Sequence, residues 1–264
     1  MKNKTNQIIA FALIVSMIAL GGCKKDKEES APALPPISSL AIDVSVFAGD
    51  DLKKSTMIDT CSYFHIVSGA VGYWNLSLAI SLAIPVAAYA EALEQDAVRL
   101  DNDTWVWSYS LDNVYSADLV ADVVGDSVLV GMYITKASVY DSVLWYSGKF
   151  DILRTGGEWT INNLPDHPTT AWLKIQWNAD YKEETADIRY TVVDPANEYN
   201  NSYIEYGKKT DPDYDLYYYL YLSQEDRLYS VGYNSKTHVG YVTYDANQFC
   251  WNVNHANTDC PGID

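Results

Sequence analysis

The chain has 264 residues, 13% of them aromatic, with 22 tyrosines and a formal net charge of −17 at pH 7. This acidic balance argues against a nucleic-acid partner and against a protein that lies flat on anionic lipid. The length is sufficient for one sizeable hydrophobic core.

The first 22 residues have the pattern of an export signal. Lys2 and Lys4 provide a basic start, an apolar run follows from Ile8 to Leu20, and LGGC ends at Cys23. The run, about 13 residues, is shorter than a membrane-spanning helix. The segment resembles the signal of bacterial lipoproteins, in which the peptidase cuts before the cysteine, a diacylglycerol is attached to its thiol and its amine is acylated. The resemblance implies a mature chain anchored in a membrane through Cys23.

Loss of residues 1–22 removes two lysines and leaves 16 basic against 35 acidic residues, a net charge of −19. Acyl chains on Cys23, such as palmitate, hold a protein stably on a membrane because each buried methylene contributes about 0.8 kcal/mol. We therefore expect an outer-membrane lipoprotein of the bacterial cell envelope, and both the periplasmic and the surface face remain open. Residues 23–40 are charged and then rich in proline and serine, which predicts a disordered tether before a single globular domain at 41–264.

Three further cysteines are present, Cys61, Cys250 and Cys260. We expect a disulfide between Cys250 and Cys260, because their spacing closes a short loop and exported proteins meet an oxidising environment. Such a bond stabilises by about 3 kcal/mol. Cys61 is then a free buried thiol or an alternative partner of one of the other two, and the sequence leaves this open. No local signature marks it as a catalytic nucleophile.

An apolar segment spans residues 66–95 and contains no charged residue before Glu91. It is apolar on nearly every side at helical spacing, which indicates a helix buried from several directions or lying in lipid. Its length permits a transmembrane helix, but Pro85 removes a backbone donor near its middle. We therefore predict two short buried helices within about residues 63–98.

From about residue 104 to 254 the pattern changes to short runs of alternating β-branched and aromatic residues separated by turn formers. No helical pattern lies between these runs, which predicts an antiparallel meander of about 11 strands. Twist accumulates across so many strands, so we expect a curved sheet, either an open or a closed barrel, packed on the apolar helices. The predicted fold class is thus α+β, mainly β with N-terminal helices.

This order of elements, a lipoprotein signal, apolar helices and then about 11 strands, resembles the open-barrel lipoprotein carriers of the LolA and LolB type. The resemblance implies a curved antiparallel sheet around short helices, with a hydrophobic hollow for acyl chains. It rests on element order alone, so none of that family's functional residues is assigned to this chain.

Candidate sites of metal binding and catalysis are few. The histidines lie too far apart in the sequence to show the spacing of a zinc site. The four histidines are His65, His167, His238 and His255. DNDTW from Asp101 and DPDYD from Asp211 resemble fragments of calcium loops but lack the glycine and distal glutamate of an EF-hand, so we expect solvated turns. We expect no metal site and no cofactor, and no catalytic residue can be named.

Aromatic residues are the best candidates for ligand contacts. The strand Tyr214–Leu222, YDLYYYLYL, carries large side chains on both faces, which predicts protein or ligand against each side. Its tyrosines could equally be β-formers packed on their neighbours. The candidate ligand-binding residues are Trp74, Trp105, Trp107, Tyr217, Tyr219 and Tyr221.

Three functions are compatible with these patterns. The first is a lipid-anchored protein that binds an apolar or amphiphilic ligand on a concave sheet. The second is a surface interaction module in which exposed tyrosine and tryptophan contact a glycan or a protein. The third is an envelope hydrolase, since a catalytic carboxylate pair cannot be distinguished among so many acidic residues. We favour binding over catalysis.

Overall fold

The computed structural model describes residues 30–40, 62–100, 103–163 and 170–261. The predicted leader, Cys23 and Cys61 lie outside these residues. From Pro32 to Asp264 the chain forms one compact unit, which holds all of the helices and strands named below.

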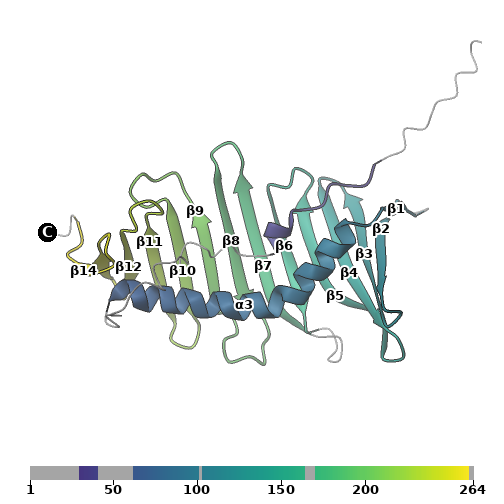
Figure 1. Ribbon diagram of the computed structural model, residues 1–264, viewed down its shortest axis with the longest axis horizontal. Helices are drawn as coiled ribbons and strands as arrows, with labels where there is room; N and C mark the ends of the chain where they lie inside the picture. Colours follow the sequence, from purple (N-terminus) through teal and green to yellow (C-terminus); the bar gives the residue numbers. More distant parts are fainter. Residues whose placement is uncertain (1–29, 41–61, 101–102, 164–169, 262–264) are drawn as a thin grey trace, which may run out of the picture. The chain divides into compact units, whose positions relative to one another are not determined.

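A single antiparallel sheet of 14 strands dominates this unit, and the strands follow one another in sequence order. The sheet is open, with β1 at one edge and β14 at the other (Figure 1). The strands are β1 (Val98–Arg99), β2 (Trp105–Leu111), β3 (Tyr115–Val124), β4 (Ser127–Lys136), β5 (Tyr140–Asp151), β6 (Gly156–Asn162), β7 (Ala171–Asp180), β8 (Thr185–Val192), β9 (Tyr203–Lys208), β10 (Leu216–Leu222), β11 (Arg227–Tyr233), β12 (Gly240–Tyr244), β13 (Asn247–Trp251) and β14 (Asn257–Thr258).

The predicted antiparallel meander is confirmed, but the predicted number of about 11 strands is wrong. Both edge strands, β1 and β14, contain only two residues. Two residues show no alternation, so a pattern of period two cannot reveal them. Short edge strands also leave few unpaired backbone groups exposed to another chain.

Tight turns connect many of the strands. In the β2–β3 turn, Asp112 and Asn113 have φ angles of 51° and 55°, and in the β12–β13 turn Asp245 and Ala246 have 49° and 62°. Positive φ at both central residues is the type I′ geometry, whose twist matches that of paired strands. Asp and Asn tolerate this region well, whereas Ala246 adopts it at some cost.

One continuous helix, α3 (Tyr63–Leu93), replaces the two short helices that we predicted. Pro85 lies inside it, and Figure 1 shows the helix bending in the C-terminal part that contains this residue. A proline removes one helical hydrogen bond and bends a helix without always ending it. The hydroxyl of Tyr146 on β5 donates to the Pro85 carbonyl at 3.1 Å, which holds this bend against the sheet.

The helix crosses one face of the sheet and contacts β12 and β13 near its N-terminus and β2 and β3 near its C-terminus (Figure 1). At its start, the Tyr63 amide donates to Asn257 Oδ1 at 2.9 Å. Near its end, the Tyr109 hydroxyl donates to the Ala88 carbonyl at 3.2 Å. The buried stripe of α3 includes Val67, Val71, Leu78, Leu82 and Tyr89. Burial of each such side chain contributes about 1.5–3 kcal/mol.

A short segment before α3 also lies against the sheet. It contains the 3-10 turn η1 (Ile37–Ser39), and both Ser39 and Leu40 are buried. Trp159 Nε1 donates to Ser39 Oγ at 3.1 Å, and the Tyr89 hydroxyl donates to the Pro35 carbonyl at 2.9 Å. We predicted a disordered tether over residues 23–40. Its proline-rich end instead packs onto aromatic side chains of the core, so the predicted boundary at residue 40 lies too far along the chain.

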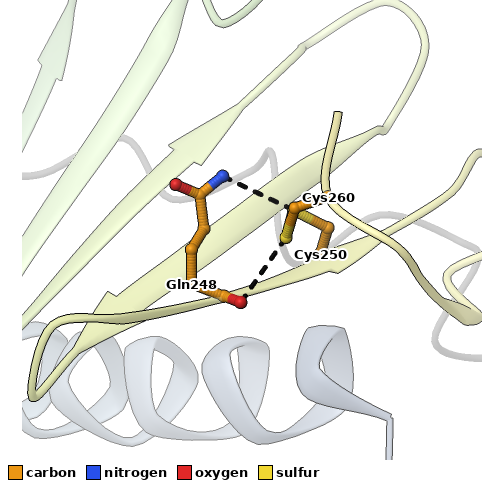
Figure 2. Close-up of a disulfide and its surroundings, with 3 residues drawn as sticks. All are labelled: Gln248, Cys250 and Cys260. Atoms are coloured by element: carbon orange, nitrogen blue, oxygen red, sulfur yellow. Dashed lines mark hydrogen bonds between the residues drawn. A yellow bond between two sulfur atoms is a disulfide. The ribbon is translucent and has the colours of Figure 1, made fainter. Parts of the chain in front are cut away.

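The predicted disulfide between Cys250 and Cys260 is present, with the two Cα atoms 5.2 Å apart (Figure 2). Cys250 is buried on β13, and Gln248 Nε2 on the same strand donates to its Sγ at 3.6 Å (Figure 2). The bond closes the chain segment that contains β14. It thereby ties the last, two-residue strand to the sheet.

Candidate ligand-binding grooves

The sheet has two different faces. Along a strand successive side chains point to opposite sides, and on β10 the buried residues Leu216, Tyr218 and Leu220 share one side. Leu220 forms a common surface with residues of α3, so this is the helix-facing side. The other side, which we call the outer side, carries Tyr217, Tyr219 and Tyr221.

The middle of the helix-facing side is filled by aromatic rings. Trp159 on β6 is fully buried, and its ring centroid lies 5.3 Å from that of Tyr89 and 6.0 Å from that of Tyr146. Burial raises the pKa of both tyrosines. Their hydroxyls therefore stay neutral and act as donors. This cluster fills the space between the sheet and the C-terminal part of α3, which contains Tyr89 and Pro85.

A first groove, groove 1, remains open beside the N-terminal half of α3. It has a volume of about 510 Å³, lies against β8, β10 and β11, and no charged side chain lines it. Its lining residues are Ile66, Val67, Ala70, Tyr73, Trp74, Ser77, Val192, Asn197, Tyr199, Leu220, Leu222, Tyr229 and Val231.

A second groove, groove 2, lies beside the C-terminal part of α3, against β2 to β5, and has a volume of about 520 Å³. The register shifts between Met132 and Tyr133, so Trp145 is an extra residue opposite them on β5. This bulge lets the consecutive residues Trp145 and Tyr146 both be buried. The lining residues are Ile84, Ala87, Ala88, Glu91, Tyr109, Leu111, Tyr115, Ser116, Ala117, Ile134, Lys136, Tyr140 and Trp145.

Groove 2 differs from groove 1 in having charged residues in its lining, Glu91 and Lys136. Lys136 Nζ lies 5.5 Å from the centroid of the Tyr115 ring, a cation–π distance. Burial, together with the negative charge of Glu91, raises the pKa of Tyr109. Groove 2 thus combines an apolar wall with polar groups that could contact the polar head of an amphiphilic ligand.

The two grooves lie at the same end of the strands. Groove 1 includes Val192 and Leu222, the last residues of β8 and β10. Groove 2 includes Leu111 and Lys136, the last residues of β2 and β4. Even-numbered strands of an antiparallel meander run in the same direction, so their last residues all lie at the same end of the strands. The grooves are therefore two separate openings on one side of α3.

Of the three tryptophans that we predicted to bind ligand, only Trp74 lines a groove. Trp107 is buried on β2, and Trp105 on the same strand lies under the guanidinium of Arg99, 6.0 Å from the ring centroid. The structure does not bring these three residues together.

The three predicted tyrosines lie on the outer side, away from both grooves. The Tyr217 hydroxyl donates to Glu205 Oε1 at 3.2 Å, and the Tyr221 hydroxyl donates to Asp226 Oδ1 at 2.8 Å. The Tyr221 ring stacks on Tyr203 with centroids 5.5 Å apart, and the Tyr217 and Tyr219 centroids are 5.1 Å apart. They form an ordered aromatic surface on a face without α3.

Several groove residues were missed at the sequence level, notably Tyr109, Tyr115, Tyr199 and Tyr229. Tyr115 begins β3, Tyr109 and Tyr229 lie two residues inside β2 and β11, and Tyr199 lies in the loop between β8 and β9. A large apolar or aromatic side chain next to a turn is a usable signal, because an ordinary solvated turn is polar. The sequence offered no way to choose among such positions.

Among the described residues, no group of three or more His, Cys, Asp and Glu side chains is placed to hold a metal ion. In DPDYD, the Asp211 carboxylate accepts from the amides of Asp213 and Tyr214, so the predicted turn is confirmed there. DNDTW lies partly outside the described residues, and its Asp103 pairs with Arg99.

The chain was also compared with known protein families, curated proteins and solved structures. No family, no curated protein and no solved structure matched it. The geometry of the grooves and of the outer side therefore carries the functional argument.

Proposed function

We propose that this protein is a lipid-anchored protein of the bacterial cell envelope that binds an apolar or amphiphilic ligand in the grooves beside α3. The single observation that carries the proposal is the pair of apolar grooves of about 510 and 520 Å³. Volumes of this size are typical of small-molecule sites, in which apolar walls give affinity and a few polar groups fix orientation.

The chemistry of the walls favours a ligand with an alkyl chain. Groove 1 has only apolar and uncharged polar side chains, so it suits a neutral chain. Groove 2 has Lys136 and Glu91 beside its apolar wall, so it suits a chain with a polar head. The linings of the two grooves share no residue, which implies two ligands or two chains and not one continuous cavity.

The cell-envelope address comes from the sequence of the leader, and Cys23 lies outside the described residues. Replacement of Cys23 by serine is expected to abolish incorporation of radiolabelled palmitate and to release the protein from the membrane fraction. Palmitate labelling that persists in Cys23→Ser would show that this anchor is wrong. This test is independent of the grooves.

Ligand binding is best tested on the full chain in its own membranes. A fatty acid that carries a diazirine and an alkyne is added to cells, irradiated and recovered on the protein, and the labelled peptides are identified by mass spectrometry. We expect labels on residues that line grooves 1 and 2. Labelling spread evenly over the surface would contradict the proposal.

Matched variants can fill each groove separately. Ala70 lines groove 1 and Ala87 lines groove 2, and both are exposed on α3, so a tryptophan at either position can enter the groove without displacing core. Ala70→Trp should reduce labelling of groove 1 by about tenfold, and Ala87→Trp should do the same for groove 2. Ala79→Trp is the control, because Ala79 is exposed on α3 but lines neither groove.

The outer side offers a second candidate function, binding of a glycan or a protein. The observation that favours it is the stacked pair Tyr203 and Tyr221, over which Arg189 extends at 4.4 Å from the Tyr203 centroid. Flat rings held in place suit a sugar or a partner side chain. Triple replacement of Tyr217, Tyr219 and Tyr221 by serine should then abolish retention on a glycan array or partner column, and unchanged retention would reject it.

A further inference from the structure

The side of α3 that faces away from the sheet is apolar and exposed. Its largest side chains are Ile66, Tyr73, Leu76, Ile80 and Ile84, with 59, 73, 61, 69 and 65% of their surface accessible. No charged residue occurs between Ile66 and Ala90. The helix is long and apolar enough to cross a membrane, yet its other side is packed on the sheet. An apolar surface of this size on a soluble domain usually marks an interaction site.

Seven of the exposed residues of α3 follow a regular spacing. We call them the outer seam, which consists of Ile66, Gly69, Tyr73, Leu76, Ile80, Ala83 and Ala87. Successive members are alternately three and four residues apart. This is the period of 3.5 by which one helix packs along another, and a flat lipid surface does not require it.

Two glycines on this side have no explanation within the chain. A Cβ atom on Gly69 or Gly72 would meet nothing within 4 Å, and neither residue needs a positive φ. Glycine inside a helix costs about 1 kcal/mol relative to alanine. Small residues on a helix surface allow the backbone of a second helix to approach closely. The glycines therefore point to a helix as the occupant of the seam.

We propose that the outer seam binds α3 of a second copy of this chain, with the two helices antiparallel about a two-fold axis near Leu76 and Ser77. This proposal goes beyond ligand binding and does not depend on it. In this arrangement Gly69 faces Ile84, which is exposed beside the outer seam of the other copy, and Ile66 faces Ala87. Small residues then meet large ones. A parallel pair would place Ile84 against Ile84 and Gly69 against Gly69, which leaves one crowded layer and one empty layer.

The exposed area is sufficient for such a contact. From their accessible fractions, the five large side chains offer roughly 600 Å² per copy, so a symmetric pair buries at most roughly 1,200 Å² through them, the lower end of specific interfaces. The seam itself brings no charge against charge, although the chain as a whole carries −17. Ile66, Tyr73 and Ile84 also line the grooves, so a second copy would cover part of each groove opening.

Disulfide formation in intact cells tests the arrangement on the full chain. Cys61 is replaced by serine throughout, and Gly69→Cys and Ile84→Cys are produced singly and together in one chain. The antiparallel pair predicts at least about tenfold more covalent dimer for the double variant than for either single variant. Equal dimer for Ile84→Cys alone would indicate a parallel pair, and no dimer in any variant would overturn the proposal.

A second test distinguishes loss of the helix–helix contact from loss of folding. Gly69→Ala combined with Gly72→Ala improves helix propensity and meets open space, so thermal unfolding should occur at the same or a higher temperature. Gly69→Leu with Gly72→Leu should reduce dimer in the Leu76→Cys background by about tenfold, while Ala79→Leu should leave it unchanged. If Gly69→Leu with Gly72→Leu leaves the dimer unchanged, or if phosphatidylethanolamine vesicles shield Leu76→Cys from a thiol reagent without any dimer, the second copy is excluded.

Discussion

On β10, consecutive tyrosines meet two different environments. Tyr218 faces α3 and is fully buried, with its ring centroid 4.9 Å from that of Tyr206. Its neighbours Tyr217 and Tyr219 face the outer side and are only half-buried. The same residue type is core on one side of the strand and ordered surface on the other. Residue identity therefore does not report the role of a tyrosine here, and the two sides should respond differently to substitution.

The largest contrast is expected from truncation of neighbouring tyrosines. Tyr218→Ala leaves a cavity in a packed region and should lower the free energy of unfolding by about 3–5 kcal/mol, by analogy with other large aromatic truncations. Tyr219→Ala should cost about 1 kcal/mol or less, because its ring is partly in solvent already. Urea unfolding of both variants measures the difference. Equal losses would show that the two sides of β10 are equally packed.

Glycines beneath aromatic rings give a second contrast between the two sides. A Cβ on Gly148 would lie 2.6 Å from Trp159, and a Cβ on Gly207 would lie 2.3 Å from the end of the Tyr217 ring. Trp159 is fixed in the core, so Gly148→Ala should cost about 1–3 kcal/mol through overpacking.

Tyr217 can turn outward into solvent, so Gly207→Ala should cost less than Gly148→Ala. The midpoints of thermal unfolding of the two variants decide this order. The reverse order would mean that the outer ring is held as firmly as the buried one.

Removal of single tyrosine hydroxyls should show the same contrast between the two sides of the sheet, with smaller losses in the free energy of unfolding. Tyr146→Phe loses a buried hydrogen bond to the Pro85 carbonyl and should cost about 1–2 kcal/mol. Tyr221→Phe loses an exposed bond to Asp226 and should cost about 0.5 kcal/mol or less. Chemical denaturation with both variants in parallel tests this, and a larger loss for Tyr221→Phe would contradict the assignment of sides.

The smallest but most specific difference between the two sides should appear in the ionisation of their tyrosines at alkaline pH. Burial raises the pKa of Tyr89, whereas the hydrogen bond to Asp226 is the main cause that raises the pKa of Tyr221. Above about pH 10 the unfolded chain ionises its tyrosines while these two resist, so the free energy of unfolding should fall as pH rises.

Asp226→Asn should bring the pKa of Tyr221 back toward its ordinary value and leave that of Tyr89 raised. Absorbance of tyrosinate near 295 nm reports all 22 tyrosines together, so the difference between the titration curves of Asp226→Asn and the parent chain isolates the change at Tyr221. If Asp226→Asn titrates like the parent chain, the Asp226 carboxylate is not the cause of the raised pKa of Tyr221.

Much of the fold could be predicted because it depends on neighbouring residues. Alternation of β-branched and aromatic residues predicted the strands β2 to β13, and turn formers marked their ends. The two-residue strands β1 and β14 could not be seen, since they owe their pairing to the strands beside them. Pro85 suggested a break that does not occur, because the sheet supports the helix through Tyr146.

The candidate site was less predictable. Trp74 was among the candidates and lines groove 1, whereas the candidate tyrosines of β10 lie on the outer side of the sheet, away from both grooves. Groove 1 joins residues as far apart as Ile66 and Tyr229, and groove 2 joins Ile84 to Trp145. No local pattern contains those pairs.

The sequence by itself determined a strand-rich meander, an uncharged apolar helical segment and the close spacing of Cys250 and Cys260, since each is set by residues within a few positions of one another. The tertiary structure decided which tyrosines are buried, that α3 runs unbroken, and where its flanks leave grooves. These outcomes depend on which face of the sheet the helix covers. That choice is made by contacts between residues that are 21 to 194 positions apart in the sequence.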